Sequence, residues 1–263
     1  MNPQLPLDDL LNLARDAGSA ILKIYDTDFG VEHKQDNSPL TEADLASHHT
    51  ILEGLQRITP DIPVLSEESA DIPYETRQTW QRYWLIDPLD GTREFVKRNG
   101  EFTVNIALIE HQRPSLGVVY APVLDRLYYG SIDNGAWRQD GGQATLPIQV
   151  ATHRRHPVLV AGSRSHAGDS LLSFLDKLGD HKLVSMGSSL KLCLVADGEA
   201  DIYPRLGPTS EWDTAAAQAV VEAAGGRVTT LDLEPLSYNT KDSLLNPHFL
   251  VFGDESVDWS AYL

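Results

Sequence analysis

The sequence predicts a mixed α/β protein of two subdomains that meet near residue 150. Two observations predict it. Apolar, β-rich segments follow one another through the first half of the chain, whereas strand-like and helical segments alternate in the second half. The length of 263 residues allows two modest units that share a core. We therefore expect an α+β subdomain at residues 1–150 and an α/β subdomain at residues 151–263.

The first half is expected to contain two helices followed by a meander of strands. Apolar side chains recur at helical spacing over residues 7–25, and a second helix is expected to end near Leu55. A turn is expected around Arg113 and Pro114, and another where Asp140 precedes two glycines. The expected strands are 64–65, 83–86, 102–109, 116–121, 127–130 and 136–137.

The second half is expected to alternate between strands and helices, which distinguishes it from the first half. Gly225 and Gly226 follow the last expected helix, as is typical of a helix C-terminus. The expected strands are 157–161, 200–203 and 249–252, and the expected helices are 169–178, 190–196 and 212–224.

Charge and composition narrow the range of functions. The formal net charge of -17 argues against a protein that grips nucleic acid by its phosphates, because each such contact needs Lys or Arg. Cys193 is the only cysteine, so no internal disulfide can form. Residues 1–9 lack the basic segment of a signal peptide, and no stretch approaches the roughly 20 apolar residues of a membrane span. We expect a cytoplasmic protein, either free or peripheral on the cytoplasmic face of the inner membrane.

The strongest functional motif is Asp-Pro-Leu-Asp-Gly-Thr at residues 87–92, directly after the expected strand 83–86. Two carboxylates on a tight loop can converge on one hard cation, which prefers oxygen ligands. Gly91 lets the backbone approach a ligand closely, and the amides of Gly91 and Thr92 would point outward from a helix N-terminus, where phosphate binds readily. The motif therefore places metal-binding carboxylates beside phosphate donors.

Three further acidic residues lie at the ends of expected elements. Glu67 follows the strand at 64–65, Asp44 stands in a capping-box pattern with Thr41, and Asp213 lies at the start of the Ala-rich helix. Alone, adjacent glutamates such as Glu67 and Glu68 usually form a solvated face, and helix capping explains Asp44 as well as catalysis does. Helix capping by Asp213 can coexist with metal binding. Together with the motif at 87–92 the three acidic residues predict a phosphatase that uses several metal ions.

Two other kinds of protein fit part of this pattern. Phosphatases of the haloacid dehalogenase type carry Asp-x-Asp-Gly-Thr, whereas Asp87 and Asp90 are one residue too far apart for that motif. A non-catalytic metal-binding protein is the second alternative. No EF-hand loop is present, and the Gly91–Thr92 pair would then have no purpose.

The four acidic segments together resemble the lithium-sensitive inositol monophosphatase superfamily, whose motifs follow in the same order along the chain. Ser66 stands where the wider inositol phosphatase motif has Gly, and it fits the 3'(2'),5'-bisphosphate nucleotidase branch of that superfamily. The segments that carry the likeness to the superfamily are 34–44, 66–69, 87–92 and 212–216, and those that carry the likeness to the bacterial nucleotidase branch are 80–84, 94–107, 187–191 and 203–209.

The resemblance implies a fold and an activity. The fold is the five-layered α-β-α-β-α sandwich of inositol monophosphatase and fructose-1,6-bisphosphatase. The activity is lithium-sensitive hydrolysis of 3'-phosphoadenosine 5'-phosphate to AMP and phosphate with two to three Mg2+ ions, which implies a role in sulfur metabolism. Inositol monophosphatase activity, or that of another sugar-phosphate phosphatase, is the alternative. The expected partner is a small nucleotide bisphosphate, and the expected state is a monomer or a homodimer.

The resemblance also assigns roles to individual residues. It gives water activation to Asp44 with Thr92, beside a metal near Glu67, and phosphate contacts to Gly91 and Thr92. The mechanism is then an in-line attack by water without a covalent enzyme intermediate. The implied metal ligands are the side chains of Glu67, Asp87, Asp90 and Asp213 and the backbone carbonyl of Leu89.

A nucleotide needs further contacts, which we place mainly in the second half of the chain. Lys191 and Arg205 can pair with the phosphate that is not cleaved. His166 can bind the 5'-phosphate or the base, although a surface-loop histidine explains it equally well. The expected substrate contacts are Ser163, His166, Gly187, Ser188, Lys191 and Arg205, together with Glu67, Leu89, Asp90, Gly91, Thr92 and Asp213 from the metal site.

Overall fold

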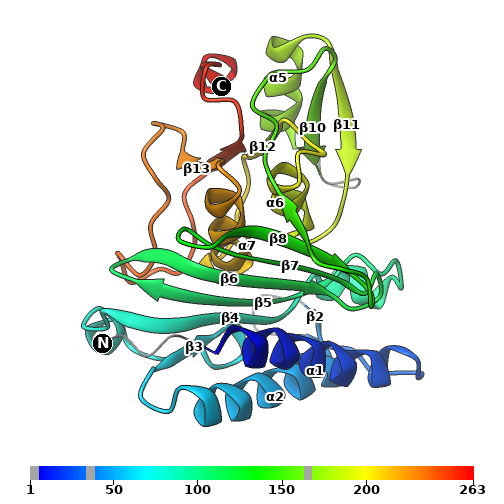
Figure 1. Cartoon of the computed structure of the whole chain (residues 1–263), viewed down its shortest axis with the longest axis vertical. Coiled ribbons are helices and arrows are strands. Elements are labelled where there is room, and N and C mark those ends of the chain that lie inside the picture. The colour runs from blue at the N-terminus through cyan, green and yellow to red at the C-terminus, as the bar shows by residue number, and fades with distance from the viewer. Residues whose placement is uncertain (1–5, 34–38, 163–167) are drawn as a thin grey trace.

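The computed structural model describes residues 6–33, 39–162 and 168–263, and these residues stack in five layers (Figure 1). Helices α1 (Leu7–Tyr25) and α2 (Glu42–Ile58) form the first layer, against a large sheet. Helices α6 (Leu190–Ala196) and α7 (Glu211–Ala223) lie between that sheet and a smaller one. Helix α5 (Asp169–Leu178) covers the far face of the smaller sheet. The expected five-layered sandwich is therefore confirmed.

Within the described residues, the larger sheet has seven strands in the order β3-β4-β5-β6-β7-β8-β9. Its neighbours pair antiparallel, except that β3 and β4 are parallel. The strands are β3 (Val64–Ser66), β4 (Arg82–Asp90), β5 (Thr103–Glu110), β6 (Arg113–Ala121), β7 (Arg126–Ser131), β8 (Gly135–Asp140) and β9 (Leu146–Ile148).

Strand β4 is buried on both faces, which explains its unbroken apolar sequence. Trp84 and Ile86 point toward α1 and α2, whereas Tyr83 and Leu85 point toward the layer of α6 and α7. Side chains alternate across a strand, so neither face can be polar when helices cover both. The strand thus serves two cores at once.

The smaller sheet has five strands in the part of the chain that the structure describes, in the order β11-β10-β12-β14-β13. Strand β10 pairs parallel with β11 and β12, and β14 pairs antiparallel with β12 and β13. Phe174 of α5 and Trp259 near the C-terminus pack in the core on its outer face. The strands are β10 (Val158–Gly162), β11 (His181–Ser185), β12 (Ile202–Arg205), β13 (Arg227–Thr230) and β14 (Phe249–Phe252).

Short elements connect these layers. Helix α3 (Tyr74–Arg77) precedes β4, and α4 (Thr92–Val96) follows it directly. The remaining elements are the strands β1 (Glu32–His33) and β2 (Pro39–Leu40), the 3-10 helix η1 (Glu67–Ser69) and the 3-10 helix η2 (Trp259–Tyr262). Among the described residues, no helix is long and apolar enough to cross a membrane.

One hydrophobic core spans both halves of the chain. Leu85 and Val119 of the larger sheet share it with Val195 of α6, Val220 of α7 and Val251 of the smaller sheet. The two sheets use residues on opposite sides of position 150, yet α7 packs against β6 of the larger sheet. A division into subdomains at residue 150 therefore stays a prediction.

The turn between β5 and β6 differs from the expectation. His111 and Gln112 form it with φ of 49° and 66°, and Arg113 and Pro114 already belong to β6. Turns with two positive φ values are usually signalled by Asn or Gly, because other side chains are strained there. Neither Asn nor Gly occurs at this turn, so the sequence pattern placed the predicted turn at Pro114 instead.

The approach of α7 to β6 depends on Gly117. A Cβ atom at this position would lie 2.0 Å from the carbonyl oxygen of Ala216 in α7. Backbone cannot yield as a flexible side chain does, so the helix and the sheet would have to separate. Gly117 therefore sets the distance between the two layers.

We expect Gly117→Ala to destabilise the fold by about 3 kcal/mol, because overpacking against backbone forces α7 away from the sheet. Thermal unfolding should show a melting temperature lower by roughly 6 °C or more. Gly142→Ala is the matched control, since a Cβ there meets nothing within 4 Å. Equal melting temperatures for the two variants would contradict the packing argument.

Candidate metal-dependent active site

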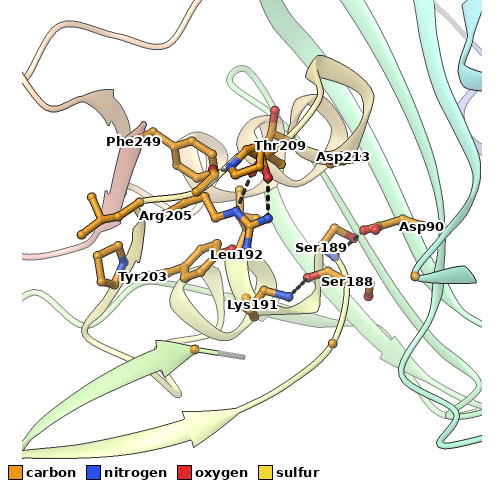
Figure 2. Close-up of a pocket in the computed structure, with 18 of the residues that line it drawn as sticks. Asp90, Ser188, Ser189, Lys191, Leu192, Tyr203, Arg205, Thr209, Asp213 and Phe249 are labelled. Atoms are coloured by element: carbon orange, nitrogen blue, oxygen red, sulfur yellow. Dashed lines mark hydrogen bonds between the residues drawn. The ribbon is translucent and has the colours of Figure 1, made fainter. Parts of the chain in front are cut away.

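Asp87 and Asp90 from β4 meet Asp213 from α7. One carboxylate oxygen from each lies within 4.8 Å of the others, so the three side chains can share a cation. Asp87 is buried, and the other two are partly exposed at the end of a pocket. In Figure 2, Asp90 lies beside Ser189, on the opposite side of the view from Tyr203 and Arg205.

An irregularity in β4 brings its two aspartates together. Asp87 pairs with Asn105 and Asp90 with Thr103, so β4 has one more residue than β5 between these pairs. Residues three apart on a regular strand point to opposite faces, and one extra residue reverses that relation. We expected a tight loop after the strand, but β4 runs through to Asp90. The bulge, not a loop, turns both carboxylates toward one point.

Capping positions Asp213. It is the third residue of α7, and its Oδ2 accepts the backbone N–H of Ser210 at 2.8 Å in a capping box. The Ser210 loop is tied down in turn, because Asn246 Nδ2 donates to the Ser210 carbonyl at 2.8 Å. Asp213 can therefore cap the start of α7 and still take part in binding a cation.

Glu67 lies next to Asp87 because β3 is parallel to β4. Ser66 pairs in register with Ile86, so Glu67, which directly follows the end of β3, lies beside Asp87 of β4. The Glu67 side chain forms a hydrogen bond with Asp87. This brings a fourth carboxylate to the cluster, as the sequence predicts.

Burial and mutual repulsion raise the pKa of the clustered aspartates. For Asp87 the pKa lies well above its usual range because of burial and the charges of Glu67, Asp90 and Asp213. Burial raises the pKa of Asp90 to about 6, although the Lys191 charge opposes the shift. Burial and the charges of Asp90 and Glu67 raise the pKa of Asp213 to about 8. A divalent cation would supply the missing positive charge, and carboxylate oxygens suit Mg2+.

Asp44 and Thr92 meet at the edge of this cluster. Asp44 is 1% exposed, and its Oδ2 accepts both the backbone N–H and the hydroxyl of Thr41 at 2.7 Å. Thr92 Oγ1 lies 3.2 Å from Asp44 Oδ1 and 3.3 Å from the Leu89 carbonyl oxygen. The structure therefore brings together the pair to which the resemblance assigns water activation.

A pocket of about 520 Å3 extends from the carboxylates toward the smaller sheet. Tyr203, Phe249 and Leu192 line it, together with the polar residues Lys191 and Arg205 (Figure 2). Ser163 and His166 lie outside the described residues. Gly187, Ser188, Asp90, Gly91 and Asp213, which are among the expected substrate contacts, line the pocket.

Two of the cations that line the pocket, Lys191 and Arg205, already donate hydrogen bonds within the protein. Lys191 is 8% exposed, and its Nζ donates to the carbonyls of Ser188 at 2.7 Å and Met186 at 3.4 Å. Burial lowers the pKa of Lys191, while the charge of Asp90 opposes that effect. Arg205 donates to Thr209 Oγ1 and to the Pro208 carbonyl, each at 2.6 Å. Both side chains keep further N–H groups.

The five-layered sandwich, the clustered carboxylates and the adjoining pocket together indicate a metal-dependent phosphatase. The chain belongs to the inositol monophosphatase family, which it matches over residues 6–252.

One relative and two solved structures show which members of the family this chain is similar to. The 3'(2'),5'-bisphosphate nucleotidase CysQ of Salmonella typhimurium is 54% identical over 247 residues, which cover 93% of this chain and 98% of that protein. The crystal structure of CysQ from Bacteroides thetaiotaomicron superposes with a TM-score of 0.83 at 39% identity, covering 97% of this chain and all of that one. An inositol monophosphatase of Thermotoga maritima gives a TM-score of 0.78 at 25% identity, covering 97% and 95%. The predicted resemblance is confirmed.

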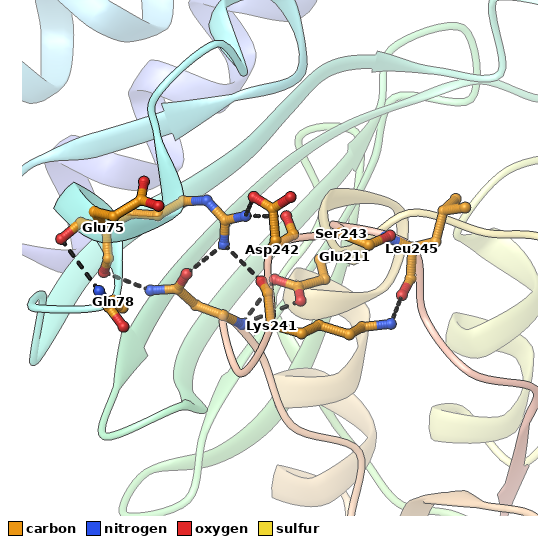
Figure 3. A network of polar contacts seen from close by, with 9 residues as sticks. Glu75, Gln78, Glu211, Lys241, Asp242, Ser243 and Leu245 are labelled. Atoms are coloured by element: carbon orange, nitrogen blue, oxygen red, sulfur yellow. Dashed lines mark hydrogen bonds and ion pairs between the residues drawn. The ribbon is translucent and has the colours of Figure 1, made fainter.

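A network of polar contacts around a buried arginine, which sequence analysis did not predict, supports the start of α7 (Figure 3). Arg77 of α3 is 2% exposed and donates to Asn239 Oδ1 at 2.5 Å and to the Lys241 carbonyl at 3.2 Å. The Asn239 N–H donates to Glu211 Oε2, at 2.9 Å, in the first residue of α7. Arg77 thus holds, from the first half of the chain, the helix that carries Asp213.

We expect Arg77→Met to destabilise the protein by about 3–5 kcal/mol, because it leaves the buried Asn239 side chain without its donor and removes the hydrogen bonds to the carbonyls of Lys241 and Asp242. Arg227→Met is the control, since Arg227 forms an exposed ion pair with Glu255 and should change stability by at most about 1 kcal/mol. Urea unfolding of both variants measures the difference. A loss no larger for Arg77 than for Arg227 would show that the network contributes nothing.

Proposed function

We propose that this chain hydrolyses 3'-phosphoadenosine 5'-phosphate to AMP and phosphate. The observation that carries the proposal is the pocket that joins a cluster of carboxylates to Lys191 and Arg205. One end suits a phosphate that is attacked with the help of cations, and the other suits a second phosphate. The nucleotidase relatives support an adenosine bisphosphate as the substrate.

The donor set supports two to three Mg2+ ions. All candidate ligands are oxygens, and the raised pKa values of the aspartates reflect like charges that a cation would offset. Cations bound there would make water more acidic and offset the charge on the phosphate and on the leaving oxygen. The residues that would hold them are Glu67, Asp87, Asp90, Asp213 and the carbonyl of Leu89.

Asp44 and Thr92 would take the proton from the attacking water. The hydrogen bond between them supports this, because the hydroxyl can pass a proton to the carboxylate as it orients the water. Gly91 precedes α4 with φ of 94°, a conformation that glycine adopts without strain. Its amide and that of Thr92 would donate to oxygens of the bound phosphate.

Arg205 is the better candidate for the phosphate that is not cleaved. Lys191 already uses two of its three N–H groups on carbonyls, whereas Arg205 uses two of five. A guanidinium can also bind phosphate through two parallel hydrogen bonds. Ser188 and Gly187 line the same pocket and would contact the nucleotide.

The proposal includes a metabolic role, a cellular location and an oligomeric state. The enzyme would act in sulfur metabolism as a cytoplasmic protein, free or peripheral on the inner membrane, and as a monomer or a homodimer. Its substrate would be a small nucleotide bisphosphate and not a nucleic acid polymer. Residues 1–150 would carry most metal ligands, and residues 151–263 would supply Asp213 and most nucleotide contacts.

Phosphate release measured side by side on three substrates tests the proposal. With Mg2+, the rate on 3'-phosphoadenosine 5'-phosphate should exceed the rates on inositol 1-phosphate and fructose 1,6-bisphosphate, and lithium should inhibit. A preference for inositol 1-phosphate would favour the alternative function on the same fold. Absence of Mg2+-dependent release from all three would refute a phosphatase of this kind.

We expect Asp90→Asn to lower kcat/KM by more than about 100-fold, because it removes a charge from the cation ligands themselves. The melting temperature without Mg2+ should stay equal or rise, since one source of repulsion is gone. The stabilisation that Mg2+ gives the wild type should disappear. Asp133→Asn, in an exposed turn, is the control. Near-normal turnover of the Asp90 variant at saturating Mg2+ would exclude Asp90 as a ligand.

We expect Arg205→Ala to lower kcat/KM for 3'-phosphoadenosine 5'-phosphate about tenfold or more, the value of one charge-assisted hydrogen bond. Inositol 1-phosphate lacks the second phosphate, so its hydrolysis should change less. Arg227→Ala removes the same charge at a residue that does not line the pocket, and it controls for general electrostatics. Equal losses on both substrates would show that Arg205 acts on the fold and not on the second phosphate.

A further inference from the structure

We propose that Ser189 is a positioning residue, which fixes the orientation of the Asp90 carboxylate for a divalent cation. The inference rests on the metal site of the proposed function and goes beyond it, because Ser189 is neither a metal ligand nor a predicted substrate contact. It comes from the second half of the chain, whereas Asp90 comes from the first. Figure 2 shows the two residues facing each other.

Ser189 contacts Asp90 directly and indirectly. Its backbone N–H donates to Asp90 Oδ2 at 2.5 Å. Its hydroxyl lies 2.9 Å from Asn105 Oδ1 and 2.8 Å from Thr103 Oγ1. Asn105 Nδ2 in turn lies 3.4 Å from the same Asp90 oxygen. The residue is 2% exposed, so these contacts are shielded from water.

The protons in this network can be placed in one way. Asn105 Oδ1 is an acceptor only, so the Ser189 hydroxyl donates to it. The Thr103 hydroxyl must then donate to Ser189 Oγ, at 2.8 Å, in preference to Asp90 Oδ2 at 3.5 Å. Strand β5 thus provides both partners of the Ser189 hydroxyl: Thr103 donates to it, and Asn105 accepts from it.

The hydroxyl of Ser189 thereby decides which end of the Asn105 amide faces the carboxylate. With Oδ1 held by Ser189, Nδ2 points at Asp90 and donates to it. The reverse orientation would set a carbonyl oxygen against a carboxylate, which is repulsive. Two donors therefore converge on Asp90 Oδ2, which fixes how the carboxylate presents itself to a cation.

The loop that carries Ser189 is rigidly placed. Lys191 Nζ donates to the carbonyls of Met186 and Ser188 in this loop. A Cβ at Gly187 would lie 2.5 Å from the Glu101 carbonyl oxygen, so the loop lies directly against the segment before β5. Ser189 therefore meets Asp90 at a fixed position.

Magnesium titrations without substrate test the inference, by calorimetry and by the rise in melting temperature. We expect Ser189→Ala to weaken Mg2+ binding about tenfold, as is typical when a partner of a metal ligand is removed. At saturating Mg2+ its kcat should stay within about threefold of the wild type, because the ligands themselves are intact. Thr59→Ala is the control, since it removes a hydroxyl that accepts the Nε1–H of Trp84, nearer the other end of β4.

Two further variants change the same hydrogen bonds while keeping the side-chain shape, so the test does not depend on whether Ser189→Ala folds. Thr103→Val keeps the shape and removes the proton donated to Ser189, so it should weaken Mg2+ binding by less than Ser189→Ala does. Ser189→Cys keeps a weak donor and should lie between the wild type and Ser189→Ala.

The outcomes separate the inference from the proposed function. If the wild type binds no Mg2+, the metal site itself is wrong. If the wild type binds Mg2+ and all three network variants bind it equally well, only the role of Ser189 is overturned. A variant that binds Mg2+ normally but loses kcat at saturating Mg2+ would also overturn it, because Ser189 would then act on the substrate.

Discussion

Repulsion among clustered carboxylates is the constraint on which the rest of this structure depends. Asp87, Asp90 and Asp213 lie within reach of one another, and each ionises less readily than a solvated aspartate. The protein offsets part of this cost with one backbone N–H for each carboxylate, donated by Leu89, Ser189 and Ser210 respectively. Such donors stabilise the charged form but do not neutralise it. The remaining imbalance is one that a bound cation would offset.

Much of the fold follows from the sequence, because buried strands and amphipathic helices leave clear patterns. Strand β4 reads as an apolar run since both of its faces are covered, and α1 shows a helical stripe since one face packs on the sheet. Strand β11 could not be predicted in this way. It lies at the edge of the smaller sheet and is half exposed, so its sequence carries no alternation. Edge strands are defined by their neighbours more than by their own residues.

The sequence also predicts the acidic residues of the site, but not what holds them. Chemistry restricts the ligands of a hard cation to a few residue types, and these can be found in the sequence. Ser189, Asn105 and Arg77 act through hydrogen bonds to residues far away in the chain, and serine or asparagine at a given position has many other uses. The bulge in β4 is equally hidden, because only the register against β5 reveals the extra residue. The resemblance to the family included Ser189 and Asn105 in its segments without giving either a role.

The same contacts explain why the two halves of the chain need to be joined rigidly. Asp213 belongs to α7, whereas Asp87 and Asp90 belong to β4, so a cation held by all three would bind both halves at once. Gly117 sets the distance of α7 from the sheet, and Arg77 holds the start of that helix. A ligand present at 100 times its Kd stabilises the folded state by about 2.7 kcal/mol when it binds that state alone. Because packing and hydrogen bonds already fix the oxygens, little of that free energy is lost in ordering them. The rigid contact between the layers is therefore a condition for tight cation binding and not a separate property of the fold.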